Sequence, residues 1–418
     1  MDPSPSPADD AFAVHPREVR SALKRSSLVD PFLCARYSLS PYMACGHGCA
    51  YCDGRAERYW VEGVFDRDIV VRRNLPDLLR RELPRLRERA PIAVGSGIAD
   101  AYQPLESRER IMAECAAILA DAALPVTILT KSTLITRDID AWARVNERAG
   151  FMLDMSIATL DETVRRRFEP GAPPIAERLE TLRAFSRRGI AVGVMAMPLL
   201  PFIGDGEPEI RELVTACRDA GAAFVMPGGL TLRPGRQKDF FLARLAESCP
   251  ELLLEYRRIY GEERASGACT RDYRSALEER CARVCREIGV PFLLPHALYR
   301  RWLPLYDEVH LLLQHMAELY GARGVSTAPL TAAARGYATW LNGKKTGFNR
   351  RRSLTQEELE AEARALFAGD GALEVLGNEK LAVFLRRVVV DREVFDYTTL
   401  TLSRDPGSPI EPLFKTLF

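Results

Sequence analysis

Six short apolar segments rich in β-forming residues recur along the first 235 residues, and the stretches between them carry leucines or alanines at helical spacing. Strands that alternate with helices pair in parallel, so this pattern predicts an α/β fold built on a partial or complete parallel (β/α)6 barrel. The predicted strands are Ala35–Ser40, Ile92–Gly97, Val126–Thr130, Phe151–Ile157, Ile190–Met197 and Ala223–Leu232. The predicted helical stretches are Leu75–Ala90, Arg108–Ala123, Asp138–Ala149, Ile175–Arg188 and Glu207–Ala220.

Three glycines, Gly150, Gly189 and Gly221, stand where a predicted helix gives way to a strand, as expected of helix ends. After Pro234 the alternation stops, and three helical stretches are expected to pack on the barrel. They are Asp239–Tyr260, Asp272–Ile288 and Leu305–Tyr320.

The remainder of the chain is expected to form a small accessory region. It holds a basic loop, a predicted helix over Thr355–Phe367 and an apolar run, Ala382–Val390, interpreted as a strand. We therefore divide the chain into four parts. These are a flexible tail (residues 1–30), a barrel (31–235), a helical extension (236–320) and a C-terminal accessory region (321–418).

The composition of the chain leads to an expectation about its location in the cell. Apolar residues make up 47% of the 418 residues and charged residues 28%, which is ordinary for a soluble protein. No basic segment followed by an apolar one begins the chain, and no apolar run reaches the roughly 20 residues that span a bilayer. We expect a cytoplasmic protein whose ten cysteines are thiols or metal ligands. The net charge of +1 favours no particular partner.

A cysteine-rich loop follows the first predicted strand. It runs Cys45-Gly-His-Gly-Cys49-Ala-Tyr-Cys52. Three thiolates at this spacing can bind three irons of a 4Fe–4S cluster and leave the fourth iron open. Gly46 and Gly48 suit a loop that folds tightly around a metal. Parallel barrels also place their chemistry on loops at the carboxyl ends of strands.

Three other interpretations of this loop remain open. A ferredoxin-type cluster needs a fourth cysteine, and none follows until Cys115. A structural zinc site also needs a fourth ligand, for which His47 is available but lies within the loop itself. Three inert buried cysteines are the simplest alternative, although a glycine-rich loop is not typical of a core.

The Cys-x3-Cys-x2-Cys motif with an aromatic residue before its last cysteine resembles the signature of radical S-adenosylmethionine (SAM) enzymes. The resemblance implies that the cysteines hold a 4Fe–4S cluster whose open iron is chelated by SAM. It further implies reductive cleavage of SAM to a 5′-deoxyadenosyl radical, with an electron supplied by a reductant such as ferredoxin or flavodoxin.

A narrower resemblance, over about residues 38–260, is to the spore photoproduct lyase-like branch. The motifs that carry it are Ser-Pro-Tyr before the cysteine loop, Asp100-x-Tyr102-x-Pro104-x-Glu106, Leu129-Thr-Lys-Ser132, Ser156-Ile-Ala-Thr-Leu-Asp161, Glu169-Pro170 and Met197-Pro-Leu-Leu-Pro-Phe-Ile203.

This resemblance suggests further cofactor-binding residues. Ser96 and Gly97, at the end of the second strand, match the family's contact to the SAM amino group, and Tyr51 is expected beside the cluster and adenine. Lys131 matches a lysine near the SAM carboxylate, and Ser156 a serine near the ribose. The alternatives are a solvent lysine, a serine bonded to backbone, and helix caps at Asp100 and Glu106.

One departure from the branch concerns the hydrogen donor. The DNA-repairing lyases use a cysteine just after their second strand, but the segment from Gly95 to Asp100 contains none. Repair chemistry would need another donor, for which the alternatives are Tyr102, Tyr51 or a cysteine from elsewhere in the chain. Because Tyr51 is expected mainly to bind cofactor, Tyr102 is our candidate catalytic residue for that role.

Two other features have both a functional and a simpler interpretation. Cys281 and Cys285 share a helical face and, with Cys269, could form a second cluster, but buried packing thiols are favoured. The basic segment 344–352 contains Phe348 among lysines and arginines, so it is a candidate nucleic-acid contact or a solvated loop.

Three functions follow in order. The first is a spore photoproduct lyase-like radical SAM enzyme acting on DNA or another nucleic acid. The second is a radical SAM enzyme that modifies a peptide or small metabolite, and the third is a non-catalytic iron–sulfur or zinc protein.

Overall fold

Seven strands form the main sheet of the computed structural model, which describes residues 12–59, 62–95, 98–345 and 354–404. Their order is β10-β9-β8-β7-β6-β3-β2, and every neighbouring pair from β3 to β10 is parallel. The edge strand β2 is antiparallel to β3, so the sheet is a partial barrel with two open edges. The strands are β2 Leu23–Asp30, β3 Ala35–Leu39, β6 Ile92–Val94, β7 Val126–Thr130, β8 Phe151–Ser156, β9 Ala191–Leu199 and β10 Val225–Gly229. All six predicted strands are confirmed.

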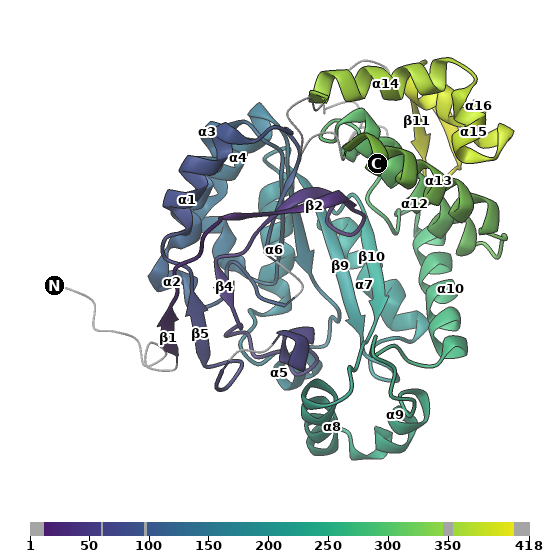
Figure 1. Cartoon of the computed structure of the whole chain (residues 1–418). Helices are drawn as coiled ribbons and strands as arrows, with labels where there is room; N and C mark the ends of the chain where they lie inside the picture. Colours follow the sequence, from purple (N-terminus) through teal and green to yellow (C-terminus); the bar gives the residue numbers. More distant parts are fainter. Residues whose placement is uncertain (1–11, 60–61, 96–97, 346–353, 405–418) are drawn as a thin grey trace.

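Helices cover the outer face of this sheet (Figure 1). They are α1 Leu75–Glu82, α2 Glu106–Glu109, α3 Ile111–Ala122, α4 Ile139–Arg148, α5 Glu162–Phe168, α6 Ile175–Ser186 and α7 Glu207–Asp219. Each predicted helical stretch of the barrel contains a helix, but Leu75–Ala90 is helical only as far as Arg85, and Arg108–Ala123 is divided between α2 and α3 at Arg110. The predicted end signals Gly150, Gly189 and Gly221 all have positive φ, which glycine adopts without strain.

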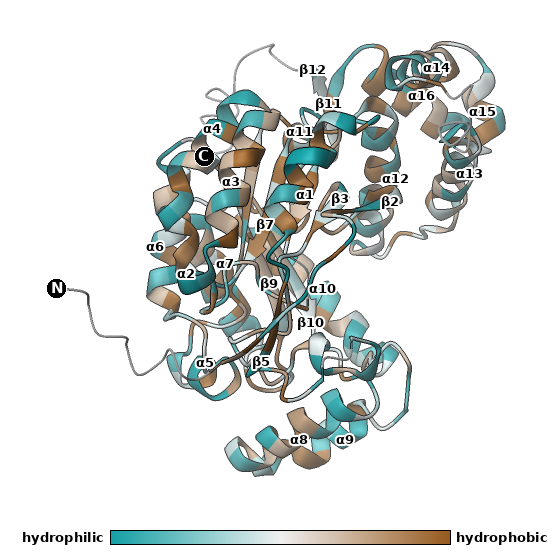
Figure 2. Ribbon diagram, turned by 60° about the vertical axis from the view of Figure 1, so that its left-hand side comes forward, coloured by the Kyte–Doolittle hydropathy of each residue, from teal (hydrophilic) through white to brown (hydrophobic). Residues whose placement is uncertain are grey.

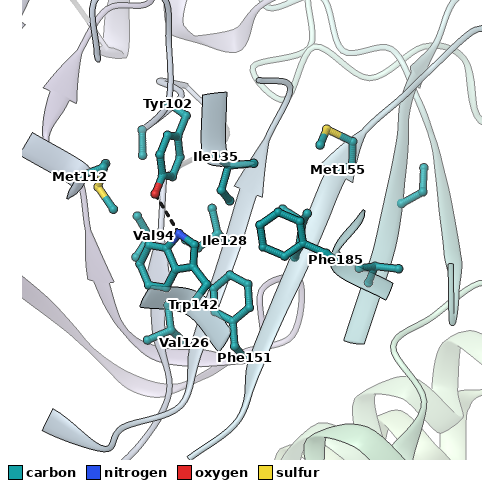
Figure 3. Packing of buried hydrophobic residues seen from close by; sticks show 14 of the residues in the cluster. Val94, Tyr102, Met112, Val126, Ile128, Ile135, Trp142, Phe151, Met155 and Phe185 are labelled. Atoms are coloured by element: carbon teal, nitrogen blue, oxygen red, sulfur yellow. Dashed lines mark hydrogen bonds between the residues drawn. The ribbon is translucent and has the colours of Figure 1, made fainter. Parts of the chain in front are cut away.

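The main core lies between the sheet and these helices. Trp142 of α4 stacks on Phe151 of β8 at 4.9 Å between ring centroids, and Phe185 of α6 packs beside Phe151 (Figure 3). Hydrophobic residues are concentrated in the central strands, whereas the surrounding helices present both hydrophobic and hydrophilic residues (Figure 2). Burial of these strands on both faces explains their nearly continuous apolar sequences.

One carboxyl group inside the barrel is an exception to this apolar interior. Asp154 of β8 is fully buried, and neither of its oxygens has a hydrogen-bond partner among the described residues. Burial alone raises its pKa to about 8. Gly193 lies beside it on β9, and a Cβ there would stand 2.8 Å from the Asp154 carboxyl, so the space for this carboxyl depends on glycine.

The N-terminal part is more ordered than the sequence indicates. Residues 1–30 were predicted to form a flexible tail, but β1 Ala13–Pro16 pairs with β5 Asp68–Val71, and β2 joins the main sheet. β4 Tyr42–Met43 completes a small sheet of order β1-β5-β4. The tail prediction is therefore corrected for residues 12–30, and residues 1–11 lie outside the described part.

The helical extension begins with two helices instead of one. The predicted helix Asp239–Tyr260 is divided into α8 Arg236–Ser248 and α9 Leu253–Ile259 by a 3₁₀ turn that starts at Pro250. Proline cannot continue a helix interior because it lacks an N–H and clashes with the preceding turn. α10 Arg271–Ile288 and α12 Leu305–Gly321 follow the prediction, with the short α11 His296–Tyr299 between them.

A C-terminal cap packs against α12. Its elements are α13 Ala328–Lys345, α14 Gln356–Ala368, α15 Gly371–Leu376, α16 Glu379–Val389, β11 Glu393–Asp396 and β12 Thr401–Arg404. α12 shares one hydrophobic core with these helices, so the predicted boundary at 320/321 divides a single packed unit. The predicted helix over Thr355–Phe367 is confirmed, with Thr355 as its N-cap.

The apolar run Ala382–Val390 was interpreted as a strand, and that interpretation is wrong. It lies within α16, which Asn378 caps by accepting a hydrogen bond from the N–H of Leu381. Leu385, Val388 and Val389 are buried on one side of this helix, so the run is amphipathic with helical period.

The cap is held at the amino ends of the strands. Lys345, the last residue of α13, is buried and contacts Asp307 at 2.9 Å and Glu88 at 3.3 Å. Glu88 precedes β6 and also pairs with Arg36 at the start of β3. In Figure 1 the arrows of β9 and β10 point toward α8, and the cap lies at the opposite end. None of the helices described here is both long and apolar enough to cross a membrane.

Candidate functional site

A cavity of about 310 Å³ opens at the carboxyl ends of the parallel strands. The cysteine loop forms one side, and residues that end or follow β6, β7, β8, β9 and β10 form the others. Its walls are mostly apolar with a few converging polar groups, the usual composition of a ligand site. The polar lining residues include His47, Asp53, Asp100, Thr130, Lys131, Ser156 and Thr231, and the apolar ones Phe32, Ile98, Leu129, Met195, Met197, Pro198 and Leu230.

Cys45, Cys49 and Cys52 all line this cavity. The loop between them turns tightly, because the N–H of Gly48 bonds the Cys45 carbonyl at 3.2 Å and the N–H of Cys52 bonds the Cys49 carbonyl at 3.4 Å. Burial raises the pKa of each thiol, that of Cys49 to about 12. The tight loop therefore places all three cysteine side chains at the wall of one cavity.

The conformation of the loop requires glycine at position 48, whereas Gly46 leaves room for the Phe12 ring. Gly48 has φ +64°, which disfavours any residue with a Cβ. A Cβ on Gly46 would stand 2.6 Å from the ring of Phe12. The prediction that these glycines permit the tight loop is confirmed.

His47 is engaged elsewhere. Its Nδ1 lies 2.9 Å from the Gly171 carbonyl oxygen and its Nε2 lies 3.2 Å from the Asp100 carboxylate. Across the described part of the chain, no three His, Cys, Asp or Glu side chains converge to hold a single metal ion. His47, the fourth ligand in the zinc interpretation, thus makes hydrogen bonds that position the loop.

Asp100 joins the loops that follow β6 and β7. It accepts hydrogen bonds from the Thr130 hydroxyl at 2.7 Å, from the Lys131 N–H at 2.7 Å and from the Tyr102 N–H at 2.8 Å. Burial tends to raise its pKa, but His47 and these donors outweigh burial and lower it. Asp100 is thus a site residue that fixes the backbone at Lys131.

Lys131 and Ser156 meet at one side of the cavity. The Lys131 Nζ donates to the Ser156 Oγ at 2.6 Å and lies 3.3 Å from the Glu169 carboxylate. The ammonium also stands 5.5 Å from the centre of the Tyr51 ring. The structure therefore brings together three of the residues predicted to bind cofactor, and the solvent-lysine alternative does not fit.

Glu169 contacts several side chains of the site, although the sequence analysis did not identify it as a site residue. It pairs with Arg178 of α6 at 2.6 Å and accepts a hydrogen bond from the Tyr51 hydroxyl. Burial works to raise its pKa, but the charges of Lys131 and Arg178 dominate and hold it at about 2. Glu169-Pro170 was noticed as a motif, yet its partnership with Arg178 is visible only in the folded chain.

Tyr102 does not reach the cavity. It is fully buried in the main core, where its hydroxyl donates to Asp138 at 3.0 Å and accepts from the Trp142 indole at 2.9 Å (Figure 3). The expectation that it donates hydrogen to a substrate is therefore corrected to a packing role. Glu106 is likewise buried, paired with Arg137 at 2.7 Å and absent from the cavity walls.

Two predicted cofactor residues, Ser96 and Gly97, lie outside the described residues. Of the flanking positions, Gly95 has φ +83°, and Ile98 lines the cavity.

The additional cysteines do not gather into a second site. Cys281 and Cys285 of α10 belong to the main core, where the Cys285 thiol contacts the Val225 carbonyl oxygen at 3.9 Å. Cys269 belongs to a separate core beneath α8 and α9. Their placement agrees with packing thiols.

The basic segment 344–352 begins at the end of the barrel opposite the cavity. Lys345 is buried in its pairs with Asp307 and Glu88, so it cannot contact phosphate, which corrects the prediction for this residue. Lys344 pairs with Glu362 of α14. Residues 346–353, including Phe348, Arg350, Arg351 and Arg352, lie outside the described part.

Comparison with known proteins identifies the family. The family model of the radical SAM superfamily matches residues 39–214, the part that holds the three cysteines, Lys131, Ser156 and Glu169. This chain belongs to the radical SAM superfamily. Membership implies a 4Fe–4S cluster and SAM as cofactors.

Several relatives of this radical SAM protein are known from their sequences. Uncharacterized proteins of Mycobacterium tuberculosis and Mycobacterium bovis are each 32% identical to it over 284 residues, which are 66% of this chain and 81% of theirs. An uncharacterized protein of Methanocaldococcus jannaschii is 27% identical over 179 residues, 43% of this chain and 66% of that protein.

Solved structures share the radical SAM fold. A spore photoproduct lyase variant with bound AdoMet and dinucleoside spore photoproduct has a TM-score of 0.51 and 19% identity, covering 66% of this chain and 79% of its own. Another spore photoproduct lyase, complexed with dinucleoside spore photoproduct, has a TM-score of 0.50 and 18% identity, with the same shares of both chains covered. The expected fold class is confirmed.

Proposed function

We propose that this protein is a radical SAM enzyme that holds one 4Fe–4S cluster on Cys45, Cys49 and Cys52 and binds SAM in the adjoining cavity. The observation that carries the proposal is the convergence of these thiols with Lys131 and Ser156 on one cavity of about 310 Å³.

The residues present fit a cubane cluster with one open iron. Three cysteines supply three thiolates, and His47, the nearest other donor in the loop, is bonded to Gly171 and Asp100. Burial keeps the thiols protonated, so cluster binding would displace their protons.

The polar side of the cavity fits the charged end of SAM. Lys131 can offer its ammonium to a carboxylate, and the Ser156 hydroxyl can bond a ribose, as the family resemblance suggests. Glu169 and Arg178 hold Lys131 at this side, and Asp100 fixes its backbone. Leu129, Met195 and Met197 supply apolar surface for the rest of the cofactor.

When bound and given one electron by an external reductant, the cluster and SAM would supply a 5′-deoxyadenosyl radical for hydrogen abstraction. The chain's own contribution is positional. Lys131 and Ser156 would orient the bound molecule, Tyr51 packs against the Lys131 ammonium, and the apolar walls border the space in which the molecule would lie.

For the substrate, a nucleic acid is the first proposal, supported by the fold shared with spore photoproduct lyase. A peptide or small metabolite is the second. One observation favours it: among the described residues that line the cavity, the three loop cysteines are the only thiols, and Tyr102 lies outside it. The basic segment 344–352 begins at the end of the barrel opposite the cavity, which also favours the peptide or metabolite alternative.

The cofactor proposal is tested by anaerobic reconstitution. The wild-type protein should hold about four irons and four sulfides per chain and cleave SAM to 5′-deoxyadenosine when reduced with dithionite. Cys45→Ala, Cys49→Ala and Cys52→Ala should each lose the cluster, and Cys217→Ala, a buried cysteine in the main core, is the matched control. Full clusters in all three loop variants would overturn the assignment.

The substrate is tested by product analysis. The reduced protein is incubated with SAM and ultraviolet-irradiated oligonucleotides, and both 5′-deoxyadenosine and the chromatographic retention of the oligonucleotides are measured. A nucleic-acid substrate should accelerate SAM cleavage and change the retention; the mass stays the same if a photoproduct is reversed, because the photoproduct is an isomer of its parent. Absence of both effects favours the peptide or metabolite alternative.

A further inference from the structure

A second, larger hollow of about 850 Å³ lies beside the cofactor cavity. The two spaces adjoin, because Phe32, Met197 and Gly229 line both of them. The cofactor cavity, of about 310 Å³, is at the lower end of the range for ligand sites and is assigned to SAM, so a substrate needs further space beside it. The adjoining hollow is large enough to supply that space.

The hollow occupies the gap between the two open edges of the partial barrel. Residues 226–229 of the edge strand β10 line one side, and Phe32, which follows the other edge strand β2, lines another. α10 and the end of α12 form the remaining walls.

α10 packs alongside β10 and runs in the opposite direction (Figure 1). The Cys285 thiol near the end of α10 contacts the Val225 carbonyl at the start of the strand. Leu277, in the first half of α10, lies beside Gly229 at the end of the strand. The first half of α10 is therefore the half nearer the cofactor cavity.

The described lining of the hollow carries both signs of charge in equal number. Its charged side chains are Glu278, Glu279, Arg283, Arg286, Glu318 and Arg323. Nucleic-acid sites carry an excess of positive charge, which this lining lacks. Arg283 is already compensated, by Glu207 at 2.9 Å and by Glu279.

The other four charged side chains form two pairs of like charge, each with one member on α10. In the acidic pair, Glu318 of α12 lies near Glu278, and burial together with the Glu278 charge raises the pKa of Glu318. In the basic pair, Arg323 lies near Arg286, and burial together with the Arg286 charge lowers the pKa of Arg323. Like charges therefore face each other at two places in the hollow.

The protein itself compensates these pairs only weakly. Within the described part of the chain, neither Glu318 nor Arg286 forms an ion pair. Glu278 lies 3.7 Å from the half-exposed Arg274, and Arg323 donates to backbone carbonyls at 3.0–3.4 Å. A ligand with a cation at the acidic pair and an anion at the basic pair would relieve both repulsions.

The spacing of the two pairs indicates the length of such a ligand. Glu278 and Arg286 are eight residues apart on α10, which corresponds to about 12 Å along the helix. A single amino acid is too short to reach both pairs, whereas an extended peptide covers this distance with about four residues. Side chains four residues apart on an extended chain also point to the same face.

We propose that this hollow binds an extended peptide, with a basic side chain at the acidic pair and an acidic side chain four residues away at the basic pair. The acidic pair is on the half of α10 nearer the cofactor cavity. The peptide residues beside the basic side chain are therefore the ones presented to SAM.

This inference rests on the proposed function, because it names the substrate class of the same site, the second of the two substrate proposals. The experiment therefore measures peptide binding and SAM cleavage separately. The reconstituted full-length protein with SAM is titrated with pools of pentapeptides that have blocked termini and a neutral fluorophore, and fluorescence anisotropy gives the affinity.

The probe is the pool Lys-X-X-X-Glu, in which X is a mixture of uncharged residues. Lys-X-X-X-Lys and Glu-X-X-X-Glu test the requirement for both signs of charge. X-Lys-Glu-X-X keeps both charges and removes their spacing. A single-stranded oligonucleotide of random sequence tests the nucleic-acid alternative. The wild type should bind the probe pool about tenfold more tightly than any of the other four.

The test variant is Glu318→Lys combined with Arg286→Glu. Each pair then contains opposite charges and compensates itself, so affinity for the probe pool should fall about tenfold or more. The thermal midpoint should not fall, because the repulsion within each pair is removed. Glu318→Gln alone, which keeps the side-chain shape, should weaken binding less. Glu147→Lys with Arg144→Glu, on exposed positions of α4, is the control and should bind like the wild type.

The outcomes separate the two proposals. Equal affinity of the wild type for the probe and control pools, or unchanged affinity in both Glu318 variants, overturns the peptide site. Tighter binding of the oligonucleotide overturns it in favour of nucleic acid. If dithionite drives no SAM cleavage in the wild type, the proposed function fails, and the affinities still decide whether the hollow binds peptide.

Discussion

Replacing Asp154 by asparagine should stabilise the protein at neutral pH, and the gain should grow as pH rises. The carboxyl group is fully buried inside the barrel without a hydrogen-bond partner among the described residues. Burial raises its pKa from 3.8 to about 8. Between these values the unfolded chain releases the proton that the folded chain keeps, so ionisation favours the unfolded state.

The magnitude follows from this difference. Each pH unit above 3.8 costs about 1.4 kcal/mol until the folded group itself ionises near pH 8. The cost is absent below pH 3.8, reaches about 4 kcal/mol at pH 7, and stops growing above pH 8. Asparagine has a similar shape and does not ionise, so the variant avoids this cost.

Urea unfolding at pH 5, 6 and 7 measures the effect. The free energy of unfolding of Asp154→Asn minus that of the wild type should increase by about 2.7 kcal/mol between pH 5 and pH 7. Asp121→Asn, whose side chain is 87% exposed, controls for replacing an aspartate in general. A difference that stays constant with pH would refute the reasoning and show that the folded state ionises this carboxyl normally.

Three further predictions concern the site and its surroundings. Lys131→Ala should weaken SAM binding tenfold to a hundredfold, since a lost charge-assisted hydrogen bond costs about 1.5–3 kcal/mol. The control Lys344→Ala should leave SAM affinity unchanged. Isothermal titration measures both affinities, and equal values for Lys131→Ala and the wild type would show that Lys131 does not bind SAM. Glu169→Gln should destabilise the fold by about 3–5 kcal/mol because it leaves buried cations unpaired, and an unchanged thermal midpoint would contradict that. Cys281→Ala with Cys285→Ala should leave the iron content of the reconstituted protein unchanged; loss of iron would reveal an auxiliary cluster.

The barrel could be predicted because each of its strands and helices is specified by a short stretch of sequence. Each strand is a short apolar run, β8, β9 and β10 each follow a helix-end glycine, and parallel pairing follows from the alternation of strands with helices. The run Ala382–Val390 failed the same reasoning because a short apolar stretch fits both periods. The decisive signal there was Asn378, an N-cap residue just before the helix.

The cysteine loop was also predictable, since its three ligands are neighbours in sequence. The polar side of the site could be predicted only in part. Glu169 acquires its role by meeting Lys131 and Arg178, which come from different elements. Tyr102 lies close to Asp100 in sequence, yet its side chain points into the core toward Trp142. Side-chain direction after a strand depends on tertiary packing, which a single sequence does not record.

The separation of the C-terminal cap from the cofactor cavity has a practical consequence for attaching this protein to surfaces. Val383 and Val390 of the cap are 57% and 42% exposed and lie at the amino ends of the strands. A cysteine or affinity tag introduced there would anchor the protein to an electrode or bead with its catalytic end facing the solution. The cavity would then face the solution in every molecule, because all molecules would share one orientation.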